Sequence, residues 1–383
     1  MPVPSRLRLG VVAAEPSGDR LGSGLVSVLR ERVPSLELRG IGGPELSRLG
    51  LESACDIHDL SIMGLEDLWR KLPNAVKIRK RLITNFRRDP PDLFLGIDSP
   101  DFNLRLERRL RNSGIPVMHL VSPTVWAWRG YRVKKIRQAV DRILVLFPFE
   151  KDFYEKRGVP ATFVGHPAAR ETADLSKDGS RKLLELAPNG KIVSVLPGSR
   201  ESEIKHLSSI FVGSIRSLAE ADPGLSFLIP FASARIRQQF LSLVSLEGLT
   251  QRVRLIDGQA RECLAASDVA LLASGTAALE AALVGCPMVV AYRVSALSYR
   301  VARALASTKI VSMPNHLMPE PLVPEFLQKA ATEENLVPAV QRLLSDADAI
   351  EQTRDSLLGI HETLDLDTND RIAEAILKGV RRR

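Results

Sequence analysis

The stretch Val269-Ala-Leu-Leu-Ala-Ser-Gly-Thr-Ala-Ala-Leu-Glu-Ala-Ala-Leu-Val-Gly-Cys-Pro-Met-Val-Val-Ala-Tyr292 decides the fold. Apolar runs at 269–273 and 288–292 predict two buried parallel strands. The good helix formers between them, at 277–284, predict a connecting helix that Gly285 ends. Strand, helix and strand form one βαβ crossover, which is the unit of an α/β fold with a parallel sheet.

The turn Ser274-Gly275-Thr276, between the first strand and the helix, is the first candidate for a functional site. It brings backbone N–H groups and a helix start to the carboxyl end of a strand, where α/β proteins bind phosphates. Its hydroxyls can also cap the helix. Glu280 follows Thr276 by four residues, so both side chains can face one ligand. A phosphate on the turn and a sugar diol on Glu280 would suit a nucleotide-sugar; a capped helix with a solvated Glu280 is the alternative.

Length and composition suit a globular enzyme with two domains. The chain has 383 residues, more than one hydrophobic core usually supports; 45% of them are hydrophobic and 26% are charged. No apolar run approaches the roughly 18 residues that a membrane span needs, and the N-terminus lacks the apolar core of a signal peptide. Cys55, Cys263 and Cys286 are odd in number and widely spaced, which argues against disulfides and a metal knuckle. We therefore expect a cytoplasmic protein.

The formal net charge of +8 would suit nucleic acid, an anionic membrane surface or acidic substrates. Aromatic residues make up only 5% of the chain, and no basic–aromatic repeat occurs. A platform for stacking bases is therefore not expected. We predict no nucleic-acid partner, whereas attraction to lipid phosphates stays open.

The order of the predicted elements indicates two halves built from βαβ units. A strand at 7–13, the turn Glu15-Pro-Ser-Gly-Asp19 and a helix open the first half, and Ser17 or Asp19 can cap that helix. The polar, pattern-poor stretch 168–190 separates it from a second half, which restarts with a strand at 191–196. We expect an α/β fold of two Rossmann-like domains facing across a cleft. The predicted domains are 1–170 and 171–345, followed by a helical tail at 346–383.

Asp98 is a candidate general base. It follows the buried strand 91–97, and a carboxylate at the carboxyl end of such a strand faces the predicted cleft. Its structural alternative is to cap the next helix, a role that Ser99 or Asp101 could equally fill. The residues alone do not decide whether Asp98 or Asp101 is the base.

Arg200 and Trp126 are candidates for binding substrate. Arg200 lies in a glycine turn after the strand 191–196, where its guanidinium could bind a diphosphate through two parallel hydrogen bonds. Trp126 and Trp128 lie in one loop, and these indoles could wall a sugar or acyl pocket, or they could be core residues near a turn. No clustered carboxylate or histidine ligands occur, so no metal is expected.

The segment 61–81 combines apolar and basic residues. Its apolar side chains include Met63, Leu65, Leu68, Trp69 and Leu72, and its basic side chains are Arg70, Lys71, Lys77, Arg79, Lys80 and Arg81. Apolar residues beside a basic face, with a tryptophan, are typical of a segment that lies in a membrane interface. An amphipathic helix packed on its own domain is the alternative, and periodicity alone favours it.

Short runs along the chain resemble the lipid-A-disaccharide synthase family. The runs are 15–19, 96–102, 121–129, 148–150, 163–167, 196–204, 274–280, 313–315 and 324–328. They stand in the family order from the first strand onward, so the resemblance covers most of the chain. Ser-Pro-Thr-Val-Trp-Ala-Trp-Arg at 122–129 and Gly-His-Pro at 165–167 are its most specific parts.

The resemblance implies an inverting GT-B glycosyltransferase that uses no metal or other cofactor. It would join UDP-2,3-diacylglucosamine to 2,3-diacylglucosamine 1-phosphate (lipid X), giving the β-1,6-linked lipid A disaccharide 1-phosphate and UDP. The nearest rival is another GT-B enzyme such as a UDP-GlcNAc 2-epimerase, which would need neither a lipid-binding face nor the loop 122–129. Charge alone supports a non-enzyme rival, a basic protein that binds membranes or nucleic acid.

Carried over motif by motif, the resemblance also implies roles for single residues. The residues on the UDP side are Arg200, Ser274, Gly275, Thr276, Glu280, Asn315 and Gln328. Asp98 would be the general base, and an acceptor-side loop would contain Ser17, Gly18 and Asp19. The segment 63–76 resembles a membrane-docking patch, which reverses the argument from periodicity.

The resemblance finally bears on location and assembly. It implies a cytoplasmic enzyme bound peripherally to the inner face of the cytoplasmic membrane. For the tail 346–383, two arrangements stay open: it crosses back to the first domain, or it is exchanged between the subunits of a homodimer.

Overall fold

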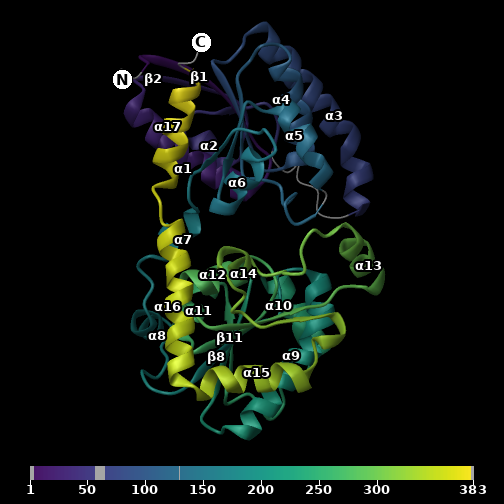
Figure 1. The fold of residues 1–383 in the computed structure, drawn as a ribbon, viewed down its shortest axis with the longest axis vertical. Helices are drawn as coiled ribbons and strands as arrows, with labels where there is room; N and C mark the ends of the chain where they lie inside the picture. Colours follow the sequence, from purple (N-terminus) through teal and green to yellow (C-terminus); the bar gives the residue numbers. More distant parts are fainter. Residues whose placement is uncertain (1–3, 57–64, 129, 381–383) are drawn as a thin grey trace. The chain divides into compact units, whose positions relative to one another are not determined.

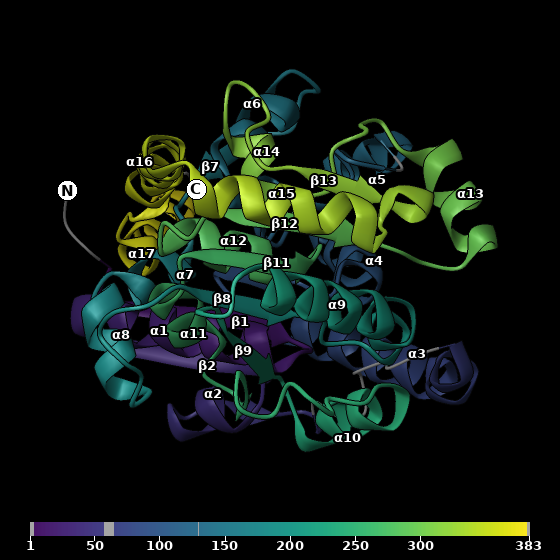
Figure 2. The same cartoon turned by 90° about the horizontal axis from the view of Figure 1, so that it is seen from below.

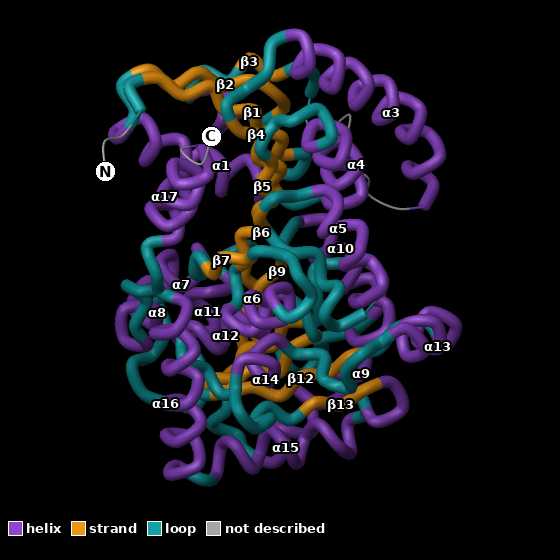
Figure 3. The backbone as a smooth tube through the Cα atoms, turned by 45° about the horizontal axis from the view of Figure 1, so that its top comes forward, coloured by secondary structure: helices purple, strands orange, loops and turns teal. Residues whose placement is uncertain are grey.

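The computed structural model describes residues 4–56, 65–128 and 130–380. Contacts within the chain divide it into two compact units (Figure 1): unit 1 comprises Met1–Pro167 and Leu366–Arg383, and unit 2 comprises Ala168–Asp365. Each unit is built on one parallel sheet, whose strands are orange in Figure 3. Among the described residues, no helix combines the length and the apolar composition that crossing a bilayer requires.

The sheet of unit 1 has seven parallel strands in the order β3-β2-β1-β4-β5-β6-β7. They are β1 Arg6–Ala13, β2 Ser35–Ile41, β3 Glu52–Ser53, β4 Leu93–Ile97, β5 Val117–Leu120, β6 Arg142–Val145 and β7 Ala161–Phe163. The order reverses at β1, which pairs with β2 on one side and with β4 on the other. The loops after β1 and β4 therefore diverge at the carboxyl edge of the sheet, as in doubly wound folds.

Helices cover both faces of this sheet. They are α1 Pro16–Arg32, α2 Pro44–Arg48, α3 Leu65–Arg88, α4 Pro100–Arg111, α5 Val133–Ala139, α6 Pro148–Glu155 and α17 Thr368–Val380, with a 3-10 turn at Gly130–Arg132. Leu25 of α1 and Ile372 of α17 pack on one face, and Leu106 of α4 and Ile136 of α5 pack on the other. Because both faces are buried, the central strand β4 reads as a continuous apolar run.

Unit 2 repeats the plan with six parallel strands in the order β10-β9-β8-β11-β12-β13. They are β8 Ile192–Leu196, β9 Ser226–Phe231, β10 Val253–Asp257, β11 Val269–Ala273, β12 Met288–Tyr292 and β13 Glu325–Leu327. The helices are α7 Pro167–Thr172, α8 Lys177–Leu183, α9 Glu201–Ala221, α10 Ala234–Leu243, α11 Ala260–Ala266, α12 Thr276–Leu283, α13 Ala296–Leu305, α14 Met313–Leu317, α15 Glu333–Ser345 and α16 Ala347–Leu364, with a 3-10 turn at Gln328–Ala330. The predicted crossover at 269–292 forms as β11, α12 and β12, and α15 lies along β12 (Figure 2).

The last two helices belong to different units. α16 packs against α12, α14 and α15 of unit 2, whereas α17 packs against α1 of unit 1. The segment 346–383 is thus divided after Asp365. Exchange of this segment between subunits stays a prediction.

Candidate functional site

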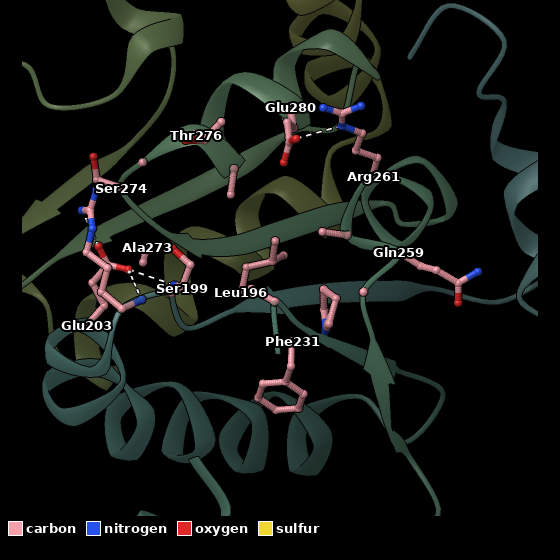
Figure 4. Close-up of a pocket in the computed structure, with 18 of the residues that line it drawn as sticks. Leu196, Ser199, Glu203, Phe231, Gln259, Arg261, Ala273, Ser274, Thr276 and Glu280 are labelled. Carbon is pink, nitrogen blue, oxygen red and sulfur yellow. Dashed lines mark hydrogen bonds and ion pairs between the residues drawn. The ribbon is translucent and has the colours of Figure 1, made fainter. Parts of the chain in front are cut away.

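A cavity of about 430 Å³ opens in unit 2 at the carboxyl ends of β8, β9, β10 and β11. The strand order reverses at β8, because the chain runs outward from β8 to β10 and then returns to the other side of β8 as β11. This is the topological position at which open α/β sheets bind ligands. Figure 4 shows the side chains that line the cavity.

Five of the seven residues predicted for the UDP side line this cavity: Arg200, Ser274, Gly275, Thr276 and Glu280. The last four come from the turn after β11 and from α12. Gly275 is the N-cap residue of α12, and Ser274 Oγ instead donates to the carbonyl oxygen of Val311 at 2.9 Å. The prediction that Ser274 caps the helix is therefore wrong, because its hydroxyl fastens a later segment to the turn.

The carboxylate of Glu280 is oriented by an arginine. Arg261 Nε donates to Glu280 Oε1 at 2.8 Å, and Arg261 Nη1 donates to Glu171 Oε2 at 2.5 Å. Figure 4 shows Arg261 beside Glu280 at the cavity wall. Burial opposes the charge of Arg261, but the two carboxylates raise its pKa. Glu280 is thus held in place as an acceptor that can receive hydroxyl donors.

Arg200 shares its loop with a second carboxylate. Glu203 Oε2 accepts from the backbone N–H groups of Ser199 at 2.9 Å and Arg200 at 3.2 Å, and Glu203 Oε1 lies 3.0 Å from Arg200 Nη1. The N–H groups of the N-cap residue of α9 and of the residue before it therefore already have an anionic partner. The Arg200 side chain remains 77% exposed, so it can turn toward a ligand in the cavity.

Asn315 and Gln328 do not line the cavity. Asn315 is 4% exposed; its Nδ2 donates to the Val323 carbonyl and to Glu325 Oε1, and its Oδ1 accepts from the N–H groups of Leu322 and Val323. The Gln328 amide, oriented as its surroundings require, donates to the carbonyl of Val294 at 3.0 Å and accepts from its N–H at 3.1 Å. Both amides therefore hold loops in place, and their contact with UDP stays a prediction.

Asp98 lies in a tight turn between β4 and α4 in unit 1. Its Oδ1 accepts from the N–H of Ser99 at 2.8 Å, and the Ser99 hydroxyl donates to Glu15 Oε1 at 2.9 Å. The predicted alternative of capping α4 is not used, because the N-cap residue is Ser99 and it makes no side-chain cap. Asp101, the other candidate base, is 87% exposed and pairs with Arg132.

The acceptor-side residues have different environments. Ser17 is exposed at the start of α1, whereas Gly18 and Asp19 are buried. The Asp19 carboxylate accepts from the backbone N–H groups of Gly43 at 2.7 Å, Glu45 at 2.9 Å and Leu46 at 3.2 Å. The predicted capping of α1 by Ser17 or Asp19 is wrong, because Asp19 instead satisfies the N-terminus of α2.

The indole of Trp126 forms a hydrogen bond with the buried carboxyl group of Glu150. Its Nε1 donates to Glu150 Oε1 at 3.0 Å, and its ring meets Phe149 edge to face, with centroids 4.8 Å apart. Glu150 is 2% exposed. Burial raises its pKa to about 7, although hydrogen bonds from Ser122, Phe147 and Trp126 oppose this. The loop that carries Trp126 is therefore held by specific polar contacts; a sugar or acyl contact of the indole stays a prediction.

The side chains predicted to contact the membrane are not among those that the structure describes. Met63 lies outside the described residues, and for Leu65, Leu68, Trp69 and Leu72 only the backbone, in α3, is described. Farther along α3, Ala75, Leu82 and Phe86 are buried in the core of unit 1. Lys77, Lys80, Arg81, Arg87 and Arg88 are exposed, so this part of α3 presents a basic face.

Sequence reasoning missed Arg261, Glu203 and the buried ionisable groups of unit 1. Arg261 could have been found, because it lies soon after β10, and the rule for strand ends applies to it as it does to Ser274. Glu203 gave only the weaker signal of a capping box at the start of α9. Across the described ranges, no three His, Cys, Asp or Glu side chains gather as metal ligands would.

Sequence comparison identifies relatives over nearly the whole chain. A sequence model of the lipid-A-disaccharide synthetase family matches residues 9–378. The lipid-A-disaccharide synthase of Alkalilimnicola ehrlichii is 44% identical over 374 residues, which cover 97% of this chain and 98% of that protein. The enzyme of the same name from Pseudomonas aeruginosa (strain UCBPP-PA14) is 45% identical over 380 residues, with coverages of 98% and 99%.

Solved structures share the fold at low identity. A UDP-GlcNAc 2-epimerase from Neisseria meningitidis bound to UDP-GlcNAc has a TM-score of 0.63 and 16% identity, over 97% of this chain and 99% of that chain. The glycotransferase of kitacinnamycin has a TM-score of 0.64 and 16% identity, over 98% and 100%. This likeness confirms the predicted GT-B class of α/β fold and carries no argument for the epimerase rival. On the sequence similarity, the chain belongs to the lipid-A-disaccharide synthase family and is a glycosyltransferase of lipid A biosynthesis.

Proposed function

We propose that this enzyme binds UDP-2,3-diacylglucosamine in the cavity of unit 2 and transfers its sugar, with inversion, to 2,3-diacylglucosamine 1-phosphate. The observation that carries the proposal is the convergence of the turn 274–276, the Arg200 guanidinium and the Glu280 carboxylate on one cavity. These groups suit a diphosphate and a ribose diol, which together define a nucleoside diphosphate. The products would be the β-1,6-linked disaccharide 1-phosphate and UDP.

The donor half of the reaction is leaving-group stabilisation. As the bond from the anomeric carbon to the diphosphate breaks, negative charge grows on UDP. The N-terminus of α12 and Arg200 would stabilise that charge without a metal ion. Arg261 would act indirectly by keeping Glu280 turned toward the ribose hydroxyls.

The acceptor half needs a base for the attacking hydroxyl. The hydroxyl oxygen would attack the anomeric carbon on the face opposite UDP while its proton passes to the Asp98 carboxylate. Asp98 is favoured over Asp101 because Asp101 is already paired with Arg132 and exposed. Asp98 is partly buried at the strand end, where a carboxylate can meet a bound hydroxyl.

The direct test is a reaction of the purified protein with both substrates. UDP-2,3-diacylglucosamine and 2,3-diacylglucosamine 1-phosphate should give UDP and one disaccharide 1-phosphate, detected by mass spectrometry. Conversion of the donor to a 2-epimer, with no disaccharide, would support the rival GT-B enzyme instead.

Gly275→Ala tests the donor cavity. A Cβ at Gly275 meets nothing within 4 Å, so the fold should tolerate it, but the methyl group would occupy space beside the phosphate-binding turn. Calorimetry should show about tenfold weaker UDP binding, the effect of roughly 1–3 kcal/mol of steric conflict. Gly359→Ala, which also adds a methyl in open space but lies on α16, is the matched control. If Gly275→Ala binds UDP with unchanged affinity, the turn 274–276 does not contact the donor.

Asp98→Asn tests the base. The amide keeps the shape of the side chain but cannot take a proton, so turnover should fall by about two orders of magnitude or more. Asp101→Asn is the control and should retain near-normal turnover. If Asp101→Asn loses turnover and Asp98→Asn retains it, Asp101 is the general base and Asp98 is not.

We further propose that α3 docks the enzyme on the inner face of the cytoplasmic membrane. The exposed basic side chains at 77–88 would contact anionic headgroups, and the apolar residues at 63–72 would enter the interface. The buried Ala75, Leu82 and Phe86 would anchor the helix to unit 1.

Replacing Leu68, Trp69 and Leu72 together by serine should reduce co-sedimentation with anionic liposomes, because the apolar part of the contact is lost. Circular dichroism should show an unchanged fold. Leu241→Ser/Leu243→Ser, which alters exposed leucines of unit 2, is the control and should bind liposomes normally. If the unaltered enzyme, the triple serine variant and the control bind liposomes equally, the segment 63–72 is instead part of a helix packed on its own domain.

A further inference from the structure

A fully buried ionisable pair lies close to the turn that carries Asp98. Glu107 of α4 and His119 of β5 are both 0% exposed, and Glu107 Oε1 lies 2.6 Å from His119 Nδ1. Burying such a pair generally costs more than burying apolar side chains of similar volume. The binding and catalytic roles described above do not use it.

The cluster also contains polar atoms without hydrogen-bond partners. Within the described part of the chain, these are Glu107 Oε2 and the Oδ1 atom of Asn103, a third residue that is 0% exposed. A buried polar group left unsatisfied destabilises the folded state. Stability alone therefore does not account for these three side chains.

The backbone is shaped to admit the pair. Gly96 of β4 is the register partner of His119 in β5. A Cβ at Gly96 would lie 2.0 Å from Glu107 Oε1 and 3.2 Å from Asn103 Cγ. Only glycine leaves room for the carboxylate at this point of the strand, two residues before Asp98.

Asn103 links the cluster to the catalytic turn. Its Nδ2 donates to the carbonyl oxygens of Asp98 at 2.8 Å and Ile97 at 3.2 Å. Asp98 and Ser99 have φ angles of 52° and 43°, and Val121, directly after β5, has a φ of 74°. Such conformations are strained at non-glycine residues and gather at functional sites. Their concentration around His119 indicates a functional constraint.

Charge connects the pair to Asp98 as well. Burial disfavours a charged imidazole, but the carboxylate of Glu107, and that of Asp98 to a smaller extent, raise the pKa of His119 above its ordinary value. The charged groups that face His119 are thus Glu107 from α4 and Asp98 from the turn after β4. Glu15, from the loop after β1, reaches the same turn through the Ser99 hydroxyl at 2.9 Å.

We propose that Glu107 and His119 are positioning residues of this enzyme: Glu107 pairs with the His119 imidazolium, and this buried pair holds the turn of Asp98 in place while the acceptor hydroxyl binds. The inference rests on the proposed role of Asp98 as base. The pair does not relay the proton of the acceptor, which passes to Asp98. Its contribution is a fixed, charged imidazole next to the turn that carries the base.

The first test measures the charge of His119 in the unaltered enzyme. Protein labelled with ¹⁵N-histidine should show, by NMR, one imidazole with both nitrogens protonated at neutral pH and above. Its signals are assigned by their loss in His119→Gln and should convert to those of a neutral ring in Glu107→Gln. A neutral ring in the unaltered enzyme at neutral pH would overturn the proposal.

The second test is the pH profile of kcat/KM in Glu107→Gln, His119→Gln and the double variant. Each change removes the cation beside Asp98, so the acidic limb of the profile should move to higher pH by about one unit, as expected for losing one nearby opposite charge. The three shifts should be equal rather than additive, because either single change already removes the imidazolium charge. KM for the donor should not change, since the donor cavity lies in unit 2. Ser194→Ala, which alters a fully buried polar residue of β8, is the control.

The outcomes separate the inference from the function on which it rests. Variants that lose activity equally at all pH values, with an unmoved acidic limb, would show a structural role and overturn the inference. If Asp98→Asn stays active, the base assignment itself fails, and that result does not depend on any His119 variant.

Discussion

The parallel direction of every strand is the constraint on which the site depends. A parallel strand can be followed only by a crossover, so each strand delivers its loop to the same edge of its sheet. In both units the strand order then reverses at the first strand, β1 or β8, which separates two neighbouring loops at that edge. The turn that contains Asp98 and the turn 274–276 occupy equivalent places, each following the strand beside that reversal.

Charged groups at these edges are held by hydrogen bonds and ion pairs within the protein itself. Glu203 of α9 accepts from the N–H groups of Ser199 and Arg200, and Arg261 of α11 fixes the carboxylate of Glu280 on α12. Groups oriented before the reaction need no reorganisation as charge develops, which is the main source of electrostatic catalysis. Arg200 is the exception, since its guanidinium is mostly exposed and retains the freedom to follow the ligand.

The buried carboxylates of unit 1 illustrate two uses of polar burial. Asp19 is nearly inaccessible, yet its oxygens accept three backbone N–H groups, so it stabilises the loop before α2. Glu107 accompanies His119 with one oxygen and leaves the other without a partner among the described residues. The first arrangement serves the fold, whereas we propose that the second acts on the neighbouring turn of Asp98.

The sequence by itself determined the α/β class, the two βαβ-built halves and the strand ends that carry Asp98, Arg200 and Glu280, because apolar periodicity and turn residues are local signals. It also determined the family, through runs such as 122–129 and 165–167. The structure was needed to show that the side chains of Asn315, Gln328 and Asp19 form hydrogen bonds with backbone groups of the same chain. It was also needed to show that Arg261 orients Glu280 and that Glu107 contacts His119 beside Gly96. Those contacts join residues on different elements, and no local pattern fixes which side chains the packing of a sheet and its helices brings within hydrogen-bond distance.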